Sequence, residues 1–176
     1  MPRGEKLRVE PLDPPLDIVL IEPEIPPNTG AVARTAAATQ SRLHLVGQLG
    51  FRIDEQAVRR AGLDYWPLVD LHVHDDVDAY LASRDVPRLH LFSSFGARSY
   101  LEMDVQPGDA LVFGKESVGL SDAILQRFPE RVWGIPTAGP VRSLNLSNAV
   151  SVVVFEALRK LGALDHPILR DDAIGG

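Results

Sequence analysis

The sequence predicts one α/β domain, with a mostly parallel sheet and helices on both faces. Short apolar runs alternate with helix-like segments along the 176 residues, and this alternation is typical of parallel sheets covered by crossover helices. The length is close to that of a single domain. Hydrophobic residues make up 45% of the chain and charged residues 24%, which is ordinary for a globular protein.

In the first half, the short β-branched run Asp17–Ile21 predicts a strand. Asn28 is suited to cap a helix that runs through the alanine-rich segment Ala31–Thr39. Two further strands and two helices are expected; the first helix has an N-cap Asp and ends at Gly62, and the second has acidic residues in its first turn. In chain order these four elements are Leu43–Val46, Asp54–Ala61, Val69–Val73 and Asp75–Ser83.

In the second half, three apolar runs predict strands. They are Leu89–Phe92, Ala110–Phe113 and Val132–Ile135. Ser121 is suited to cap a helix that ends near Phe128. The final helix is predicted over Ser147–Leu161, with Gly162 as its C-terminal stop.

The ends of the chain are predicted to lie outside this domain. Residues 1–15 are polar and proline-rich, so we expect a flexible arm, followed by the domain at 16–165 and a tail at 166–176. The N-terminus has no apolar core of a secretory signal, and no apolar run reaches the roughly 20 residues of a membrane span. With no cysteine, disulfides and thiolate metal sites are excluded. We therefore expect a cytoplasmic protein without membrane contact.

Charge and histidine content narrow the possible functions. The net charge of −6 argues against broad, non-specific nucleic-acid binding, but it leaves room for a local basic patch. His72 and His74 share one face of a predicted strand and could ligate a metal, yet no third ligand with suitable spacing is evident. Ordinary histidines are the better interpretation, and no metal site is expected.

The most polar loops follow predicted strands. They are EPEIPPNTG after Ile21, SSFGARSY after Phe92, GKESVGL after Phe113 and PTAGPVRSLN after Ile135. Ligands of open parallel sheets bind beyond the carboxyl ends of the strands. Unpaired buried polar groups are costly, so the dense set Arg142, Ser143, Asn145, Ser147 and Asn148 indicates a site for a polar ligand.

Two of these segments have both a plain structural interpretation and a functional one. NTGAVAR could be only a capped helix with a surface arginine, or Gly30 could allow close approach while Arg34 holds a phosphate. FGKESVGL could be only a connection with turn glycines. Alternatively, Gly114 exposes its backbone to a planar ligand and Glu116 adds a polar group. The segment FGKESVGL has the glycine spacing of neither a P-loop nor a dinucleotide-binding fingerprint.

Three segments together resemble the signature motifs of SPOUT-superfamily RNA 2′-O-methyltransferases. They are IVLIEPEIPPNTGAVARTAAAT, LVFGKESVGL and IPTAGPVRSLNLSNAVSVVVFEALRKLG, and RRAGLDYW resembles the single-domain TrmL (YibK-like) branch. The similarity spans about residues 17–163. It implies a deep C-terminal trefoil knot, a homodimer whose active site draws on both subunits, and bound S-adenosylmethionine. It also implies methylation of the wobble nucleotide, a cytidine or modified uridine, in a tRNA anticodon loop.

The resemblance also implies roles for individual residues. Phe92, Gly114, Glu116, Ile135 and Ser143 would contact the cofactor. The expected catalytic residues are Arg34, Ser143 and Asn145, and the expected substrate-binding residues are Asn28, Arg34 and Arg142. Arg34, Arg59, Arg60 and Arg142 would carry most RNA contacts.

At two positions the chain departs from the closest members of that branch. Phe95 stands in place of a lysine, and Phe155 in place of a tyrosine. Three alternatives stay open on the sequence. They are a methyltransferase of the same superfamily that acts on rRNA or another tRNA site, a non-catalytic module that binds S-adenosylmethionine or RNA, and a nucleotide-binding oxidoreductase domain. The third is disfavoured because the glycine fingerprint is missing.

Overall fold

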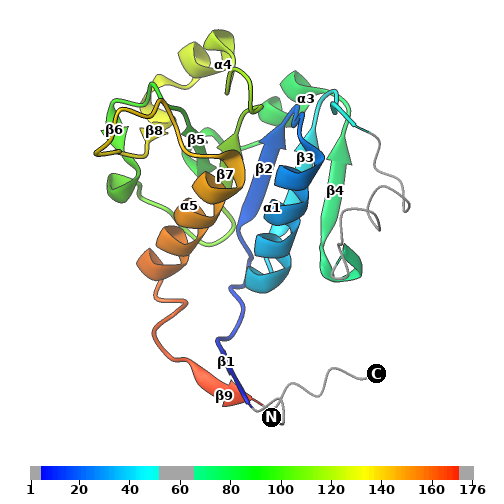
Figure 1. Ribbon diagram of the computed structural model, residues 1–176, viewed down its shortest axis with the longest axis vertical. Coiled ribbons are helices and arrows are strands. Elements are labelled where there is room, and N and C mark those ends of the chain that lie inside the picture. The colour runs from blue at the N-terminus through cyan, green and yellow to red at the C-terminus, as the bar shows by residue number, and fades with distance from the viewer. Residues whose placement is uncertain (1–4, 52–65, 171–176) are drawn as a thin grey trace.

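The computed structural model describes residues 5–51 and 66–170 and confirms the α/β architecture (Figure 1). Its main sheet has seven strands in the order β4-β3-β2-β7-β5-β8-β6, and each neighbouring pair is parallel. The strands are β2 (Asp17–Ile21), β3 (Arg42–Val46), β4 (Leu71–His74), β5 (Leu89–Phe92), β6 (Arg98–Ser99), β7 (Ala110–Phe113) and β8 (Val132–Gly134).

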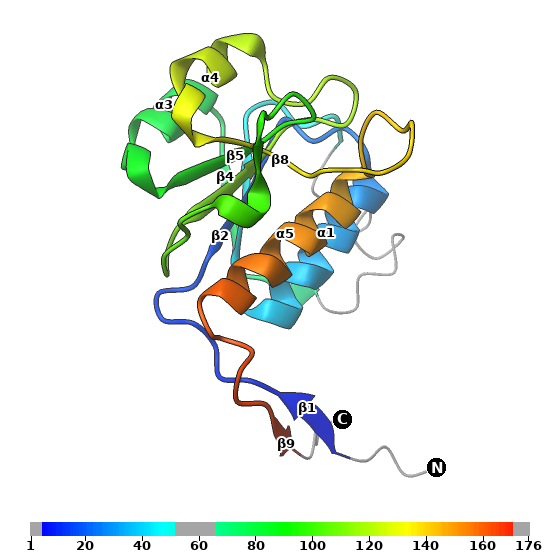
Figure 2. The ribbon, with the colours of Figure 1, turned by 90° about the vertical axis from the view of Figure 1, so that its left-hand side faces the viewer.

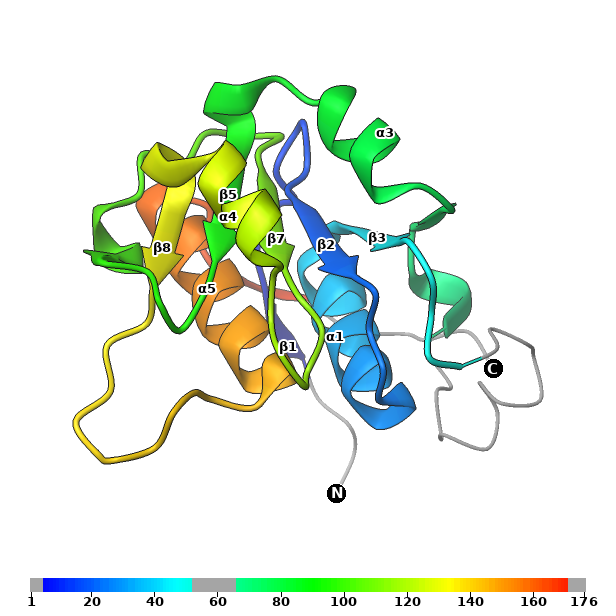
Figure 3. The ribbon, with the colours of Figure 1, turned by 90° about the horizontal axis from the view of Figure 1, so that it is seen from above.

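Helices cover both faces of this sheet, as predicted. The α-helices are α1 (Pro26–Thr39), α3 (Val77–Ala82), α4 (Asp122–Arg127) and α5 (Leu146–Lys160). Helices α1 and α5 lie side by side on one face (Figures 2 and 3), and α3 and α4 lie on the other. Four short 3-10 helices complete the described part: η1 (Trp66–Leu68), η2 (Val86–Arg88), η3 (Tyr100–Glu102) and η4 (Pro129–Arg131).

Strand β2 shows why the sheet needs cover on both sides. All five of its residues are buried. Successive side chains of a strand point to opposite faces, so Ile18 and Leu20 join the core under α1 and α5. Val19 and Ile21 join the core under α3 and α4. A continuous apolar run therefore forms a strand with two buried faces.

The start of α1 differs from the prediction. The helix begins at Pro26, its N-cap residue is Ile25, and Asn28 is buried within the first turn rather than capping it. Proline at the first positions lacks the N–H that a cap would satisfy. The carboxylate of Glu116 accepts from the backbone N–H groups of Glu24 and Ile25 at 2.8 and 3.2 Å. Glu116 thus holds the two residues before the helix, while the Asn28 N–H donates to the Ile25 carbonyl at 3.0 Å, and no side chain caps α1.

Other boundaries shift by one or two residues. Strand β4 begins at Leu71 instead of residue 69, and β8 ends at Gly134. Helix α3 starts after its cap Asp76, whose side chain accepts from the Ala79 N–H at 2.8 Å. Helix α5 starts at Leu146 because Asn145 caps it. The helix predicted over Asp54–Ala61 lies outside the described residues, as do Arg59, Arg60 and most of RRAGLDYW.

Two short segments near the limits of the described residues form a small ribbon that was not predicted. Strand β1 (Lys6–Arg8) pairs antiparallel with β9 (Ile168–Arg170). Figure 2 shows this ribbon below the main sheet, away from α3 and α4. Its apolar side chains are largely exposed, with Leu7 at 63% and Leu169 at 61%.

Candidate active site

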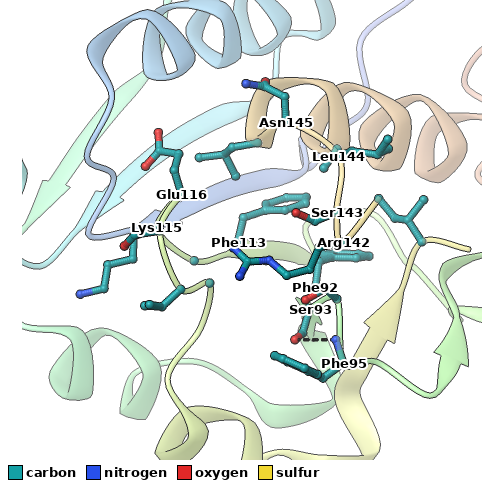
Figure 4. A pocket seen from close by; sticks show the side chains of 18 of the residues that line it. Phe92, Ser93, Phe95, Phe113, Lys115, Glu116, Arg142, Ser143, Leu144 and Asn145 are labelled. Atoms are coloured by element: carbon teal, nitrogen blue, oxygen red, sulfur yellow. Dashed lines mark hydrogen bonds between the residues drawn. The ribbon is translucent and has the colours of Figure 1, made fainter. Parts of the chain in front are cut away.

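A cavity of about 710 Å³ lies at the carboxyl ends of β5, β7 and β8 (Figure 4). Its walls are the segments 92–95, 113–119 and 142–146, with Ile25 and Asn28 from the start of α1. Because β2, β7, β5 and β8 are consecutive in the sheet, the four polar loops meet at one edge. The cavity therefore lies where the strand pattern placed a ligand site.

Most of the predicted site residues line this cavity. The structure brings together Asn28, Phe92, Gly114, Glu116, Ile135, Arg142, Ser143 and Asn145. Phe92 stacks on Phe113, with ring centroids 4.8 Å apart and an interplanar angle of 15°. Both rings are buried, so the apolar wall is rigid. Arg142 and Ser143 lie on the exposed loop before α5.

Gly114 allows the β7 loop to fold tightly on itself. A Cβ atom at this position would lie 2.1 Å from the carbonyl carbon of Gly119 and 2.2 Å from the Leu120 nitrogen. Both atoms belong to the backbone and cannot rotate away, so only glycine fits. The absence of a side chain at Gly114 therefore lets the loop after β7 close on its own backbone beside the cavity that Gly114 lines.

A hydrogen-bond network joins three of the polar loops. Asn28 donates through Nδ2 to Glu116 Oε1 at 3.0 Å, and Asn145 donates through Nδ2 to Asn28 Oδ1 at 3.0 Å. The Oδ1 atom of Asn145 in turn accepts from the backbone N–H of Ser147 at 2.9 Å, which caps α5. The loops after β2, β7 and β8 are therefore linked by side chains, one of which, Asn145, also satisfies the start of α5.

Charged groups of the loops after β2 and β7 reinforce this link. Glu24 accepts from the backbone N–H of Ser117 at 3.0 Å, and hydrogen bonds from Ser117 hold the pKa of the Glu24 carboxyl below its usual range. Lys115 pairs with Glu22 at 3.1 Å. Neither acidic partner was among the predicted site residues, although the motif EPE after β2 indicates that this loop carries carboxylates toward the site.

Arg34 lies elsewhere. Helix α1 starts beside the cavity and runs away from it, so Arg34 is about 12 Å along the axis from Pro26. It is exposed and lines a second cavity of about 780 Å³, which α1 and the end of α5 form with residues 6–12. The expectation that Arg34 reaches the strand ends from its own helix is therefore not met within one chain.

The cavity is suited to binding and orienting a ligand. Of its described lining residues, only Lys115, Glu116 and Arg142 carry ionisable side chains, and Glu116 is occupied by the loop network. Within residues 5–51 and 66–170, no group of three His, Asp or Glu side chains is placed to hold a metal ion. In that same part of the chain no helix is long and apolar enough to cross a membrane.

Comparison with known proteins gives a consistent result. A model of the SpoU rRNA Methylase family matches residues 15–155. A tRNA (cytidine(34)-2'-O)-methyltransferase of Burkholderia pseudomallei (strain 1106a) is 48% identical over 149 residues, which cover 83% of this chain and 96% of that protein.

Two solved structures are also similar. One is concerned with the 2-OH methylation of C/U34 on tRNA. It has a TM-score of 0.77 and 49% sequence identity, and the aligned part covers 82% of this chain and 95% of the chain in that structure. The other, an AdoMet-bound rRNA methyltransferase from Sinorhizobium meliloti, has a TM-score of 0.70 and 26% identity. The aligned part covers 88% of this chain and 62% of the chain in that structure.

Proposed function

The chain belongs to the SpoU rRNA Methylase family, and from this premise we propose that it is an S-adenosylmethionine-dependent tRNA ribose 2′-O-methyltransferase. Its proposed target is the wobble nucleotide of the anticodon loop, a cytidine or modified uridine. The observation that carries the proposal is the cavity at the ends of β5, β7 and β8, where eight of the predicted site residues meet. The Burkholderia pseudomallei relative, named as acting on tRNA cytidine 34, supports the choice of substrate, because the match covers 96% of its length.

The cofactor proposed for this cavity is S-adenosylmethionine. Phe92, Gly114, Glu116, Ile135 and Ser143 would hold it. The fit rests on the tight turn at Gly114, where the cavity is lined by a residue without a side chain, and on the buried Phe92–Phe113 wall. When bound, the cofactor supplies an electrophilic methyl group on a sulfonium. The AdoMet-bound relative supports this assignment.

The residues of the chain would then act mainly by positioning the RNA. A ribose 2′-hydroxyl is a weak nucleophile, and holding reactants in attack geometry can supply about 7–11 kcal/mol. Arginine is a poor base because its pKa exceeds about 12, so Arg34 would bind the adjacent phosphate and stabilise the developing alkoxide. The proton would pass to phosphate or water. Arg142, Ser143, Asn145 and Asn28 would line the path of the ribose.

A homodimer forms part of this proposal. Arg34 lies on the second cavity rather than the first, so a second copy would supply it to the active site. Helix α5 supports pairing, since Val152 and Phe155 stay 39% and 48% exposed on a helix that buries its other apolar face. Large exposed apolar side chains on one helix mark an interaction face.

The remaining proposals concern fold and location. Family membership favours a trefoil knot in the C-terminal part of the domain. The chain order also favours it, because β5 lies between β7 and β8 in the sheet although it precedes both in sequence. We retain residues 1–15 as an arm, 16–165 as the methyltransferase domain and 166–176 as a tail. A tRNA-modifying enzyme would work in the cytoplasm.

Mass spectrometry of tRNA tests the function. tRNA from cells that lack the gene is incubated with the purified protein and S-adenosylmethionine, and the position of any new 2′-O-methyl group is mapped. We expect it at the wobble ribose. A methyl group found only on rRNA or at another tRNA position would refute the wobble nucleotide as the target but leave the proposed methyl-transfer reaction standing. Cofactor binding without methylation of any RNA would favour a binding module.

A further inference from the structure

Phe95 is the most exposed of the described large apolar side chains, at 78%. It lies in the turn between β5 and β6, at the rim of the first cavity, where Figure 4 shows it beside Ser93. A phenylalanine left in water forgoes the favourable free energy of burying its ring. Its place at the mouth of a site, rather than on a featureless surface, points to a ligand that covers it.

The backbone around Phe95 is held in place. Ser93 donates from its N–H to the Trp133 carbonyl at 3.0 Å, and the Gly96 N–H donates to the Ser93 carbonyl at 3.0 Å. The Phe95 N–H donates to Ser93 Oγ at 3.1 Å. A Cβ atom on Gly96 would lie 2.3 Å from the Trp133 carbonyl carbon, so the turn is pressed against β8. The ring is thus displayed on a fixed support, which reduces the ordering cost of binding.

The rim near Phe95 combines apolar and basic groups. Val118 is 67% exposed and Leu144 is 37% exposed, and both line the same cavity. Arg142 lies on the exposed loop that carries Leu144. Unpaired nucleotides present a flat apolar face and an anionic backbone, and proteins bind them with aromatic rings next to arginine or lysine. The chemistry of this rim matches such a strand.

We propose that Phe95 is a positioning residue that stacks on an unpaired nucleobase next to the target nucleotide. The inference rests on the proposed function, because the anticodon loop supplies the splayed bases. The stacked base would fix the register of the RNA, so that the target ribose enters the cavity beside Ser143 and Asn145. Stacking needs a π face but no particular base. Phe95 would therefore contribute to affinity for the loop more than to choice of sequence.

Four variants test the role of the ring. Phe95→Ala removes it, Phe95→Leu keeps an apolar side chain without a π face, and Phe95→Trp keeps the face. Leu101→Ala is the matched control, because Leu101 is 50% exposed in η3 and does not line either described cavity. Each variant is assayed for KM and kcat on an anticodon stem-loop. Binding of a labelled unpaired oligoribonucleotide is followed by fluorescence anisotropy.

We expect Phe95→Ala and Phe95→Leu to raise KM and the RNA Kd about tenfold with kcat changed little, while Phe95→Trp and Leu101→Ala stay near the wild type. Cofactor affinity by calorimetry and particle mass by light scattering should be unchanged in all four. Wild-type RNA affinity in Phe95→Leu, weakened cofactor binding in Phe95→Ala, or a changed particle mass would overturn the proposal. The anisotropy measurement needs no turnover, so it decides the role of Phe95 even if the wild-type protein does not methylate tRNA.

Discussion

The Nδ2 atom of Asn145 lies 3.0 Å from Oδ1 of Asn28 and donates a hydrogen bond to it, although the two residues are 117 positions apart in the sequence. Asn145 also caps α5 through its Oδ1 atom. One side chain therefore starts a helix and fastens it to the first turn of another. Its two roles use different atoms, so substitutions can separate them.

Asn145→Ala should lower the free energy of unfolding by about 1 kcal/mol, because the cap of α5 is lost. Asn145→Ser keeps an acceptor for the Ser147 N–H, so it should retain most of the stability, but it cannot donate an amide to Asn28. We expect methyl transfer to fall at least about tenfold in both variants. Urea unfolding and single-turnover assays measure the two effects, and a fully active Asn145→Ser protein would rule out a role for the contact with Asn28.

Gly114→Ala should abolish binding of S-adenosylmethionine. The new methyl group would meet the backbone of Gly119 and Leu120 at 2.1 and 2.2 Å, which must push the loop open and lower stability by about 1–3 kcal/mol. Gly139→Ala is the control, since a Cβ atom there has no neighbour within 4 Å among the described residues. Calorimetry should give no binding for the first variant and wild-type affinity for the second. Equal affinities would contradict the role given to the turn.

Acid should weaken the edge of the sheet where His74 packs. Burial, then the charges of His44, His72 and Arg84, lower the pKa of His74 below 6.5, and Asp75 opposes them. The unfolded state then binds more protons than the folded state just below pH 6.5, so the free energy of unfolding falls as pH drops through that value. The loss is complete once pH is below the pKa of the folded protein.

His74→Gln should flatten this decline, because glutamine does not titrate. Urea unfolding at a series of pH values from above to below 6.5 measures the slope. The exposed His166→Gln serves as the control and should keep the wild-type slope. The assignment to His74 is refuted if both variants decline as steeply as the wild type.

Arg34→Ala should abolish methyl transfer and leave the affinity for S-adenosylmethionine unchanged, because Arg34 does not line the first cavity. Arg34→Lys keeps the positive charge but not the planar guanidinium that binds a phosphate through two hydrogen bonds. The lysine variant should therefore retain only part of the wild-type activity. Single-turnover assays and calorimetry separate the two steps. Loss of cofactor binding together with activity would indicate a structural role for this arginine.

The predicted strands match the structure more closely than the predicted helix starts. Asp17–Ile21, Leu89–Phe92 and Ala110–Phe113 agree residue for residue, because a strand buried on both faces needs an unbroken apolar run. Helix starts depend on which group satisfies the free N–H atoms. At α1 the prolines in the first two positions have no N–H, and the Asn28 N–H donates to the Ile25 carbonyl at 3.0 Å, so the helix starts without the side-chain cap that Asn28 was predicted to supply.

From the sequence alone one can determine that four polar loops follow buried strands and that their residues suit a ligand site. The order of those strands and the placement of Arg34 on a separate cavity were decided only by the tertiary structure. The hydrogen bonds that Asn145 donates to Asn28 and that Asn28 donates to Glu116 were also set at that level. The physical reason is one of range. Apolar periodicity is local and is readable in a few residues, whereas contacts between loops 88 and 117 positions apart exist only after the sheet has brought the strand ends together.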